Sequence, residues 1–324
     1  MTEPVTIVIP TFKRAAQLEA VVESVFGQTG LSAIRPRMII VDNDPAGSAL
    51  PMAENLRRSA PEGISIDIIH CREPGVANAR NAAMEQVETR LVAFIDDDQT
   101  APPDWLSNLL AAYSAHGAAV TFGPVDAVLP EAITRHRAYF ESFFSRRPDH
   151  ETGVIAEFYG CGNALMDLEQ LPKLNPLFDT RMNEVGGEDD LLFIRAEEKG
   201  CNFAWAGDAR VWEHVPEKRA TLEYTLPRAI SYGQGPTRKA EETRDFLQLV
   251  YWMGVGAGQF AVFGLMAAIG WVTGSNKRAV WLDRAAQGLG KVVWRKQFKF
   301  YGQSQIPKAT PSDETTRLTA KSSA

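Results

Sequence analysis

Three consecutive carboxylates, Asp96, Asp97 and Asp98, follow directly on the short apolar run 91–95. A short apolar run with polar residues on both sides is typical of a buried strand. In an open α/β sheet, ligands bind at the carboxyl ends of the strands, which is where these acids fall. Adjacent carboxylates repel one another unless a cation or hydrogen-bond donors balance them. The pattern therefore indicates a ligand site, and a solvated acidic turn is the alternative.

Two other acidic stretches stand at comparable places in the chain. The run 38–41 ends in the turn Asp42-Asn43-Asp44-Pro45, and Glu188-Asp189-Asp190 opens a helix after two glycines. Acids in the first turn of a helix suit its dipole, so simple capping would explain the second stretch. Paired glycines also allow a ligand to approach the backbone closely. Acids that gather at one edge of a sheet form a candidate site.

Alternating strands and helices must position these residues. The apolar patterning predicts helices after most of the strands, at spacings of about thirty residues, which is typical of βαβ units and a mostly parallel sheet. Residues 129–159 are aromatic and basic with weak periodicity, and they are expected to cover the sheet. The predicted strands are 5–9, 38–41, 64–69, 91–95, 118–122, 203–205 and 210–212.

Composition restricts the class of protein. The chain has 324 residues and a net charge of −6, which argues against a general nucleic-acid binder. Its three cysteines are odd in number and far apart, so they fit neither a zinc site nor a disulfide framework. The N-terminus lacks the basic start and apolar core of a signal peptide, and we expect the N-terminal part to stay in the cytosol.

The C-terminal region has a different character. Residues 247–272 are apolar and uncharged, long enough to span a bilayer, with Gly254, Gly256, Gly258 and Gly264 as an expected packing face. Residues 279–300 resemble an amphipathic helix, and 277–299 hold seven basic residues against one acid, which favours an anionic lipid surface. If residues 247–272 spanned the membrane, these basic residues would lie outside the cytoplasm, which the positive-inside rule opposes. Monotopic attachment is therefore preferred over a membrane span or a buried core helix. We predict units 1–240 and 241–304, and a disordered tail at 305–324.

Six motifs in order identify a family. They are VTIVIPTFKR (5–14), IIVDNDP (39–45), GVANARNAA (75–83), AFIDDDQTAPPDWL (93–106), GCGNALM (160–166) and GGEDDLLFIRAEEKG (186–200). Together they resemble family 2 glycosyltransferases of GT-A fold over about residues 4–240. The turn VDNDPAGSA and the segment WEHVPEKR extend the likeness to bacterial exopolysaccharide (succinoglycan-type) transferases. The resemblance implies a Rossmann-like α/β sheet flanked by helices, with a membrane-associated helical segment after it.

The resemblance also implies roles on the donor side of the site. The donor would be a nucleoside-diphosphate sugar, most consistent with a UDP-sugar, and the cofactor Mn²⁺ or Mg²⁺. A divalent cation held by carboxylates neutralises the departing diphosphate. Asp98 is then the metal ligand, while the side chain of Asp97 points away on the strand and is better explained as a solvated turn acid. The nucleotide contacts implied are Thr11, Arg14, Asp42, Arg80 and Asp96, with a solvated position for Arg14 and a surface salt bridge for Arg80 as alternatives.

On the acceptor side, the resemblance makes Asp189 the general base and Glu188 a residue that orients the acceptor or the base. Asp190 is assigned to capping. One base without a nucleophile implies inversion at the sugar carbon. His214 follows a strand where the family often has a late metal ligand, although a structural histidine is an equal alternative. Arg228 and Arg238 are candidates for the diphosphate or for anionic lipid.

The expected acceptor is a glycan or a lipid-linked glycan, at the cytoplasmic face of the inner membrane of a bacterium. Two other functions fit parts of the sequence. FIDDDQT matches the DxDxT pattern of haloacid-dehalogenase phosphatases, but their nucleophile follows the first strand of the fold, and here three predicted strands precede Asp96. A degenerate, membrane-bound transferase that serves as a scaffold is the other alternative, and the presence of every expected carboxylate weakens it.

Overall fold

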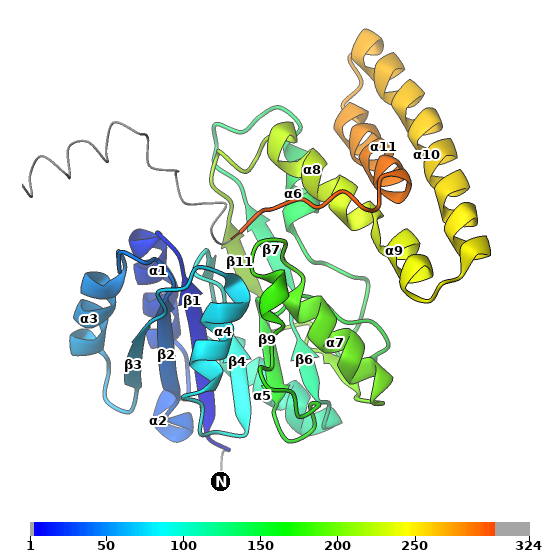
Figure 1. Cartoon of the computed structure of the whole chain (residues 1–324). Helices are drawn as coiled ribbons and strands as arrows, with labels where there is room; N and C mark the ends of the chain where they lie inside the picture. Colours follow the sequence, from blue (N-terminus) through cyan, green and yellow to red (C-terminus); the bar gives the residue numbers. More distant parts are fainter. Residues whose placement is uncertain (1–2, 302–324) are drawn as a thin grey trace, which may run out of the picture.

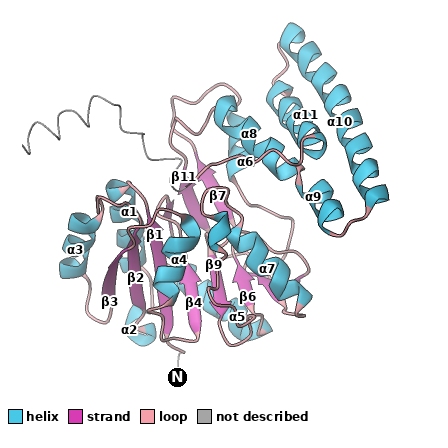
Figure 2. Cartoon of the chain, in the orientation of Figure 1, coloured by secondary structure: helices cyan, strands magenta, loops and turns pink. Residues whose placement is uncertain are grey.

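The computed structural model describes residues 3–301, and it is built on an eight-stranded sheet (Figures 1 and 2). The strand order is β3-β2-β1-β4-β9-β6-β10-β8, and all strands but β9 and β8 run in the same direction. The mostly parallel α/β sheet predicted from the sequence is confirmed. The strands are β1 (Val5–Thr11), β2 (Arg37–Asp42), β3 (Ser65–His70), β4 (Leu91–Phe94), β6 (Val120–Phe122), β8 (Gly153–Ile155), β9 (Ala164–Asp167) and β10 (Phe203–Trp205).

Helices cover both faces of the sheet because alternate residues of each strand point to opposite sides. On β1, Ile7 and Ile9 join one apolar cluster, which includes Trp105, whereas Val8 joins a second cluster with Phe178. The first cluster takes in α1 (Ala15–Phe26), α3 (Leu50–Ser59) and α5 (Trp105–His116). The second takes in α4 (Val76–Met84) and α7 (Glu188–Glu198), which lie in front of the sheet in Figure 1. The short α2 (Leu31–Ile34) and a 3-10 turn (Thr180–Met182) lie in connections.

A second, three-stranded sheet completes the end of the molecule where the site lies. It has the order β5-β11-β7, with β5 (Gln99–Thr100) directly after the three acids, β7 (Val125–Val128) and β11 (Val211–His214). Its register puts Glu213 opposite Gln99. The covering segment expected at 129–159 is partly regular, because it contains α6 (Arg137–Phe144) as well as β8.

Four helices follow the sheets: α8 (Leu222–Gly233), α9 (Gly235–Glu242), α10 (Phe246–Thr273) and α11 (Arg278–Val292). Helix α11 packs between α8 and α10 (Figure 1), where glycines let the backbones approach closely. A Cβ on Gly288 would lie 2.6 Å from a backbone atom of α10, and one on Gly290 would lie 2.0 Å from the carbonyl oxygen of Ile230 on α8. Neither position tolerates a larger residue without movement of a helix.

Three interpretations of this region are corrected. The amphipathic helix ends at Val292 rather than near residue 300, and the chain then turns back toward the body. Of the four glycines expected to form a packing face, only Gly256 packs against α11, since a Cβ on Gly254, Gly258 or Gly264 would meet no neighbour within 4 Å. The buried-core alternative for α10 is wrong, because only 17% of its most apolar window is buried. The tail predicted at 305–324 lies outside the described residues.

Candidate active site

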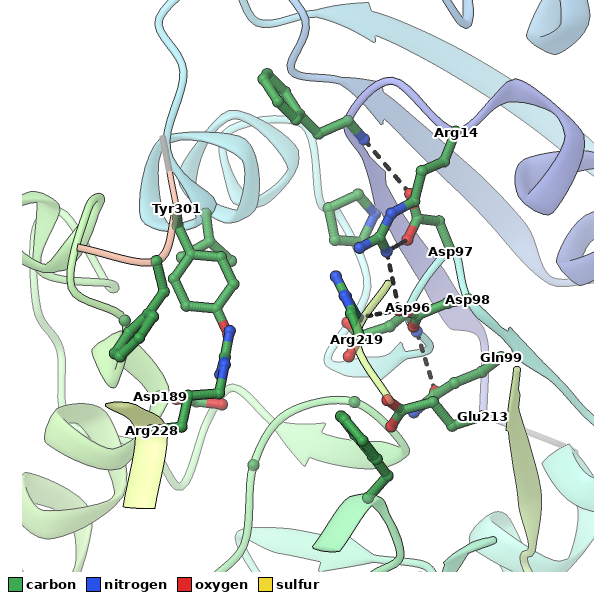
Figure 3. A pocket seen from close by; sticks show the side chains of 18 of the residues that line it. Arg14, Asp96, Asp97, Asp98, Gln99, Asp189, Glu213, Arg219, Arg228 and Tyr301 are labelled. Atoms are coloured by element: carbon green, nitrogen blue, oxygen red, sulfur yellow. Dashed lines mark hydrogen bonds and ion pairs between the residues drawn. The ribbon is translucent and has the colours of Figure 1, made fainter. Parts of the chain in front are cut away.

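A pocket of about 870 Å³ opens at the carboxyl ends of β1 and β4. Its walls come from segments far apart in the sequence: the residues after β1, the acids after β4, the first turn of α7, strand β11, helix α8 and residues 299–301. Figure 3 shows Asp96–Asp98 with Arg14 and Arg219 on one side, and Asp189 with Arg228 and Tyr301 on the other. Two of the three acidic stretches found in the sequence therefore face one pocket.

Asp97 and Asp98 are held by arginines and a hydroxyl. Arg14 Nη1 lies 2.6 Å from Asp97 Oδ1 and 2.9 Å from Asp98 Oδ2, and Arg219 Nη1 lies 2.9 Å from the same oxygen of Asp98. Thr11 donates its hydroxyl to Asp97 at 2.8 Å. The expectation that Asp97 is a solvated turn acid is wrong, because its carboxylate is buried and fixes Arg14 and the end of β1.

Burial raises the pKa of two acids of this wall, even though arginines lie close to them. Burial raises the pKa of Asp98 to about 7, although Arg14 opposes the shift. Burial likewise raises the pKa of Glu213 well above its ordinary value, and the neighbouring charges of Asp98 and Asp96 add to it. Such a group of oxygen donors fits a hard divalent cation by donor type. Among residues 3–301 no three acidic, histidine or cysteine side chains already surround a common metal position.

The turn Gly160-Cys161-Gly162 brings backbone against both groups of acids. A Cβ on Gly162 would lie 2.2 Å from Asp96 Oδ2, so only glycine fits beside that carboxylate. The amide of Cys161 donates to Asp189 Oδ2 at 2.9 Å. The glycines of the GCGN motif therefore have a physical explanation, since they let the main chain approach the acids of the site closely.

Asp189 reaches the pocket from the first turn of α7. Its Oδ2 accepts the hydrogen bond from Cys161, and its side chain remains 16% exposed. Asp189 therefore combines an accessible oxygen with a fixed orientation, which is what a general base requires.

Arg80 links the two acidic stretches below the pocket surface. Its guanidinium pairs with Glu188, and it lies 3.7 Å from Asp189 Oδ2 and 3.6 Å from Asp96 Oδ1. Burial raises the pKa of Glu188 to about 8, against the opposing charge of Arg80. The surface-salt-bridge alternative for Arg80 is wrong, since the residue is only 5% exposed. Arg80 is placed to orient acids on both walls.

Two residues assigned by resemblance do not reach the pocket. Asp42 is fully buried, and its two oxygens accept hydrogen bonds from the backbone amides of Asp44 (3.0 Å) and Ala49 (2.7 Å), so it holds its own turn. His214 is exposed, and its Nε2 lies 2.8 Å from the hydroxyl of Thr100. Successive residues of a strand point to opposite sides. It is the preceding Glu213 that lines the pocket.

Several arginines at the site escaped the sequence analysis. Arg146 is half-buried in the wall of the pocket and donates to the carbonyls of Gly123, Gly160, Gly162 and Asn163. Burial lowers the pKa of Arg146 to about 10. Arg219 came within the WEHVPEKR segment without a role. Arg228 does line the pocket, whereas Arg238 instead donates to the carbonyl of Trp294.

Comparison with known proteins identifies the family. The model of glycosyl transferase family 2 matches residues 6–174. The chain belongs to glycosyltransferase family 2. It is 31% identical over 278 residues to succinoglycan biosynthesis protein ExoM of Rhizobium meliloti, covering 85% of this chain and 88% of that protein. The phosphatase interpretation of FIDDDQT is therefore wrong, and this chain is a glycosyltransferase.

Solved structures confirm the GT-A fold of this family 2 glycosyltransferase. A mannosyltransferase from Pyrobaculum calidifontis, in complex with GDP-Man and Mn²⁺, has a TM-score of 0.60 at 17% identity, over 92% of this chain and 89% of that one. Residues 1–349 of S. aureus TarS, in complex with UDP, have a TM-score of 0.52 at 15% identity, over 94% and 93% of the two chains.

Proposed function

We propose that this enzyme transfers a sugar from a UDP-sugar to a glycan or lipid-linked glycan, with inversion and with the help of a divalent cation, in polysaccharide biosynthesis. The observation that carries the proposal is the arrangement of the pocket. One wall combines acids with Arg14 and Arg219, and the other presents the accessible carboxylate of Asp189. The family membership, the relation to a succinoglycan biosynthesis protein and a structural neighbour bound to UDP-GlcNAc support it.

The first wall is suited to a departing nucleoside diphosphate. Asp98 would hold Mn²⁺ or Mg²⁺, with Glu213 and Asp96 nearby, and the cation would supply Lewis-acid neutralisation of the diphosphate. Arg14 and Arg219 already face Asp98, so both guanidinium groups are within reach of phosphate oxygens bound there. The neighbour that contains GDP-Man and Mn²⁺ supports a metal-dependent donor site.

The second wall is suited to proton transfer. The acceptor hydroxyl oxygen forms a bond to the anomeric carbon while its proton passes to Asp189, and the bond to the diphosphate breaks with its electron pair leaving on UDP. A single displacement of this kind inverts the anomeric centre, by the same stereochemical reasoning that applies to inverting glycosidases. Arg80 and Glu188 hold the first turn of α7 in position for the step.

The experiment that tests this proposal is a donor screen with a metal control. The purified chain is incubated with UDP-glucose, UDP-galactose, UDP-GlcNAc or GDP-mannose in Mn²⁺, Mg²⁺ or EDTA, and release of nucleoside diphosphate is measured. We expect release from one UDP-sugar that EDTA abolishes. Equal release in EDTA would defeat the metal dependence, and donor binding without any turnover would favour a scaffold.

We also propose that helices α10 and α11 attach the enzyme to the cytoplasmic face of the inner membrane, lying along it. Helix α10 presents many exposed apolar side chains, among them Leu265 at 64% exposure. Helix α11 packs on α10 at Gly288 and on α8 of the body at Gly290, two residues further along. A perpendicular span would draw α8 into the bilayer with them, so an arrangement parallel to the membrane fits the packing better.

Flotation with vesicles of stated composition tests the attachment. Wild-type protein is expected to float with vesicles that contain phosphatidylglycerol, whereas the double variant Val262→Glu, Leu265→Glu should stay at the bottom. Gln248→Glu, which changes an exposed polar residue of the same helix, is the matched control. A reporter fused after Ala324 that is active outside the cytoplasm would show that α10 spans the membrane instead.

A further inference from the structure

The segment that follows α11 leads from the helices at the C-terminal end of the molecule back to the pocket. We name residues 293–301 the C-terminal strap. Figure 1 shows it, in orange to red, leaving α11 and crossing to the body near the top of the sheet. Lys299, Phe300 and Tyr301 at its far end line the pocket. The sequence motifs of the family end well before this segment, and they assign nothing to it.

The near end of the strap is fixed to the junction of α8 and α9. Gln234 Nε2 donates to the carbonyls of Val293 (3.2 Å) and Lys296 (2.8 Å). Glu241 accepts from Trp294 Nε1 at 2.8 Å and pairs with Arg295 at 2.7 Å. The strap therefore starts from a firm anchor on the body.

The far end of the strap binds the loop that carries the proposed base. The amides of Phe300 and Tyr301 both donate to the carbonyl of Glu184, at 2.7 and 3.0 Å, and Lys299 pairs with the Glu184 side chain. The Tyr301 ring packs directly on Gly186, where a Cβ would lie 2.7 Å from a ring carbon. Gly186 is two residues before Glu188 and three before Asp189.

Arg228 locks the ring of Tyr301 in place. Its guanidinium lies 4.7 Å from the ring centroid of Phe300, 5.1 Å from that of Tyr301 and 4.9 Å from that of Tyr224. It also hydrogen-bonds the Tyr301 hydroxyl, and burial raises the pKa of Tyr301 above its ordinary value. A guanidinium stacked on aromatic rings is attracted by their π faces, and the attraction is stronger where the contact is buried.

The Gly186-Gly187 loop has a backbone that its own residues hold only weakly. Gly186 and Gly187 have φ values of +84° and +85°, a region in which glycine moves with little cost. Backbone motion at these glycines would swing the first turn of α7, and with it Asp189. A misplacement of about 1 Å at a reacting group lowers rates by about a hundredfold.

We propose that Tyr301 is a positioning residue: the C-terminal strap clamps the Gly186-Gly187 loop and so holds Asp189 in its working position. This inference rests on the proposed function for the role of Asp189, but the clamp itself is a structural claim. It makes the segment after α11 part of the active site rather than a trailing end, and it joins the α10–α11 pair to the base through one continuous stretch of chain.

The test compares Tyr301→Ala with Tyr301→Phe in the full chain, and with Gln297→Ala, an exposed strap residue, as the control. Hydrolysis of the UDP-sugar identified in the donor screen, with water as acceptor, gives kcat and KM, and titration with UDP and Mn²⁺ gives Kd. We expect Tyr301→Ala to lower kcat about a hundredfold and to leave Kd for UDP within about twofold. Tyr301→Phe, which keeps the ring on Gly186, should restore most of the rate.

Hydrogen–deuterium exchange of peptides from 183–190, measured without substrate, decides the clamp independently of the chemistry. Tyr301→Ala should speed exchange there while Gln297→Ala does not. Unchanged exchange and unchanged kcat in Tyr301→Ala would overturn the inference, as would a Kd for UDP that rises in step with the loss of kcat. A wild-type enzyme that turns over no sugar nucleotide would defeat the proposed function instead, and faster exchange in Tyr301→Ala would still support the clamp.

Discussion

Acidic residues lie at both ends of one pair of neighbouring strands, β4 and β9. At the carboxyl end of β4 stand Asp96–Asp98 in the pocket. At its amino end, Leu91 pairs with Asp167 of β9, which is also buried. The oxygens of Asp167 accept hydrogen bonds from Arg90, Tyr113, Gln170 and the backbone amide of Glu169.

The two ends differ in how completely their charge is compensated. Burial acts to raise the pKa of Asp167, yet the hydrogen bonds from Arg90, Gln170 and Tyr113 outweigh it and hold that pKa below its ordinary value. At the other end burial wins, and it raises the pKa of Asp98 to about 7. A carboxylate whose donors outweigh the cost of burial stays ionised and holds structure, whereas one whose pKa is raised by burial is a candidate for binding a cation or a proton. The comparison separates a structural acid from the acids proposed to hold the cation.

The largest effect should come from the acid on the α7 wall. Asp189→Asn removes the proton acceptor and keeps the shape of the side chain, so we expect kcat to fall about a thousandfold while Kd for UDP with Mn²⁺ changes little. Asp190→Asn, one residue further along the same turn, is the matched control and should stay near wild type. Near-normal turnover of Asp189→Asn would show that Asp189 is not the general base.

Asp98→Ala should also impair transfer, but by the other route. Because Asp98 is proposed to hold the cation under the diphosphate, its loss should weaken UDP binding in Mn²⁺ toward the value measured in EDTA. The check is calorimetric titration of UDP in both conditions. An affinity that still depends on Mn²⁺ in Asp98→Ala would place the cation on other ligands, and Glu213→Gln is then the next variant to titrate.

A smaller effect is expected below the pocket, where Arg80 compensates Glu188. Arg80→Met leaves the buried carboxyl group of Glu188 and the nearby acids Asp189 and Asp96 without their arginine, which costs about 3 kcal/mol of folding free energy. The double variant Arg80→Met, Glu188→Gln should recover part of this loss, since the buried acid is then removed as well. Urea unfolding of the three proteins measures both steps. Full stability of Arg80→Met alone would contradict the buried pair.

Strand periodicity and motif spacing were sufficient to predict the mostly parallel sheet and the meeting of Asp96–Asp98 with Asp189. Local pattern could not tell which face of a strand end looks into the pocket. Alternation along β11 directs Glu213 inward and His214 outward, and the turn after β2 uses both oxygens of Asp42. The same residue types would have fitted equally well with His214 or Asp42 facing the pocket.

The contacts that are distant in sequence were out of reach for a different reason. Arg219 meets Asp98 from a separation of 121 positions, and Tyr301 meets Gly186 although the helices α7 to α11 lie between them in the chain. The pattern of a single sequence carries no signal for such pairs, because it reflects only the helix, strand or turn in which each partner lies. The helical part shows the same limit. The apolar stretch 247–272 predicted α10, which spans 28 residues, but which of its glycines contact α11 depends on the rotation of the two helices.

The smallest expected effect lies at the structural end of the comparison. Asp167→Asn keeps the volume but loses the charged acceptor of Arg90 and Tyr113, which should cost about 2 kcal/mol of stability at neutral pH and leave kcat unchanged. The pKa of Asp167 is lower in the folded protein than its ordinary value of 3.8, so its contribution is present above that pH and is lost as the pH falls below it. Wild type and Asp167→Asn should therefore converge in stability under acid.

Glu188 should behave in the opposite way, which makes the pH profile the sharpest test of the comparison. Its pKa is raised to about 8, so the folded protein binds a proton that the unfolded chain releases, and ionisation of Glu188 destabilises the fold increasingly as the pH rises from about 4.5 to 8. In thermal melts from pH 3 to 9, the stability difference between wild type and Asp167→Asn should shrink at the acid end. The stability of wild type relative to Glu188→Gln should instead fall as the pH rises toward 8, because only wild type carries the Glu188 carboxyl group. If both variants tracked wild type in parallel, Asp167 and Glu188 would not differ in their charge balance.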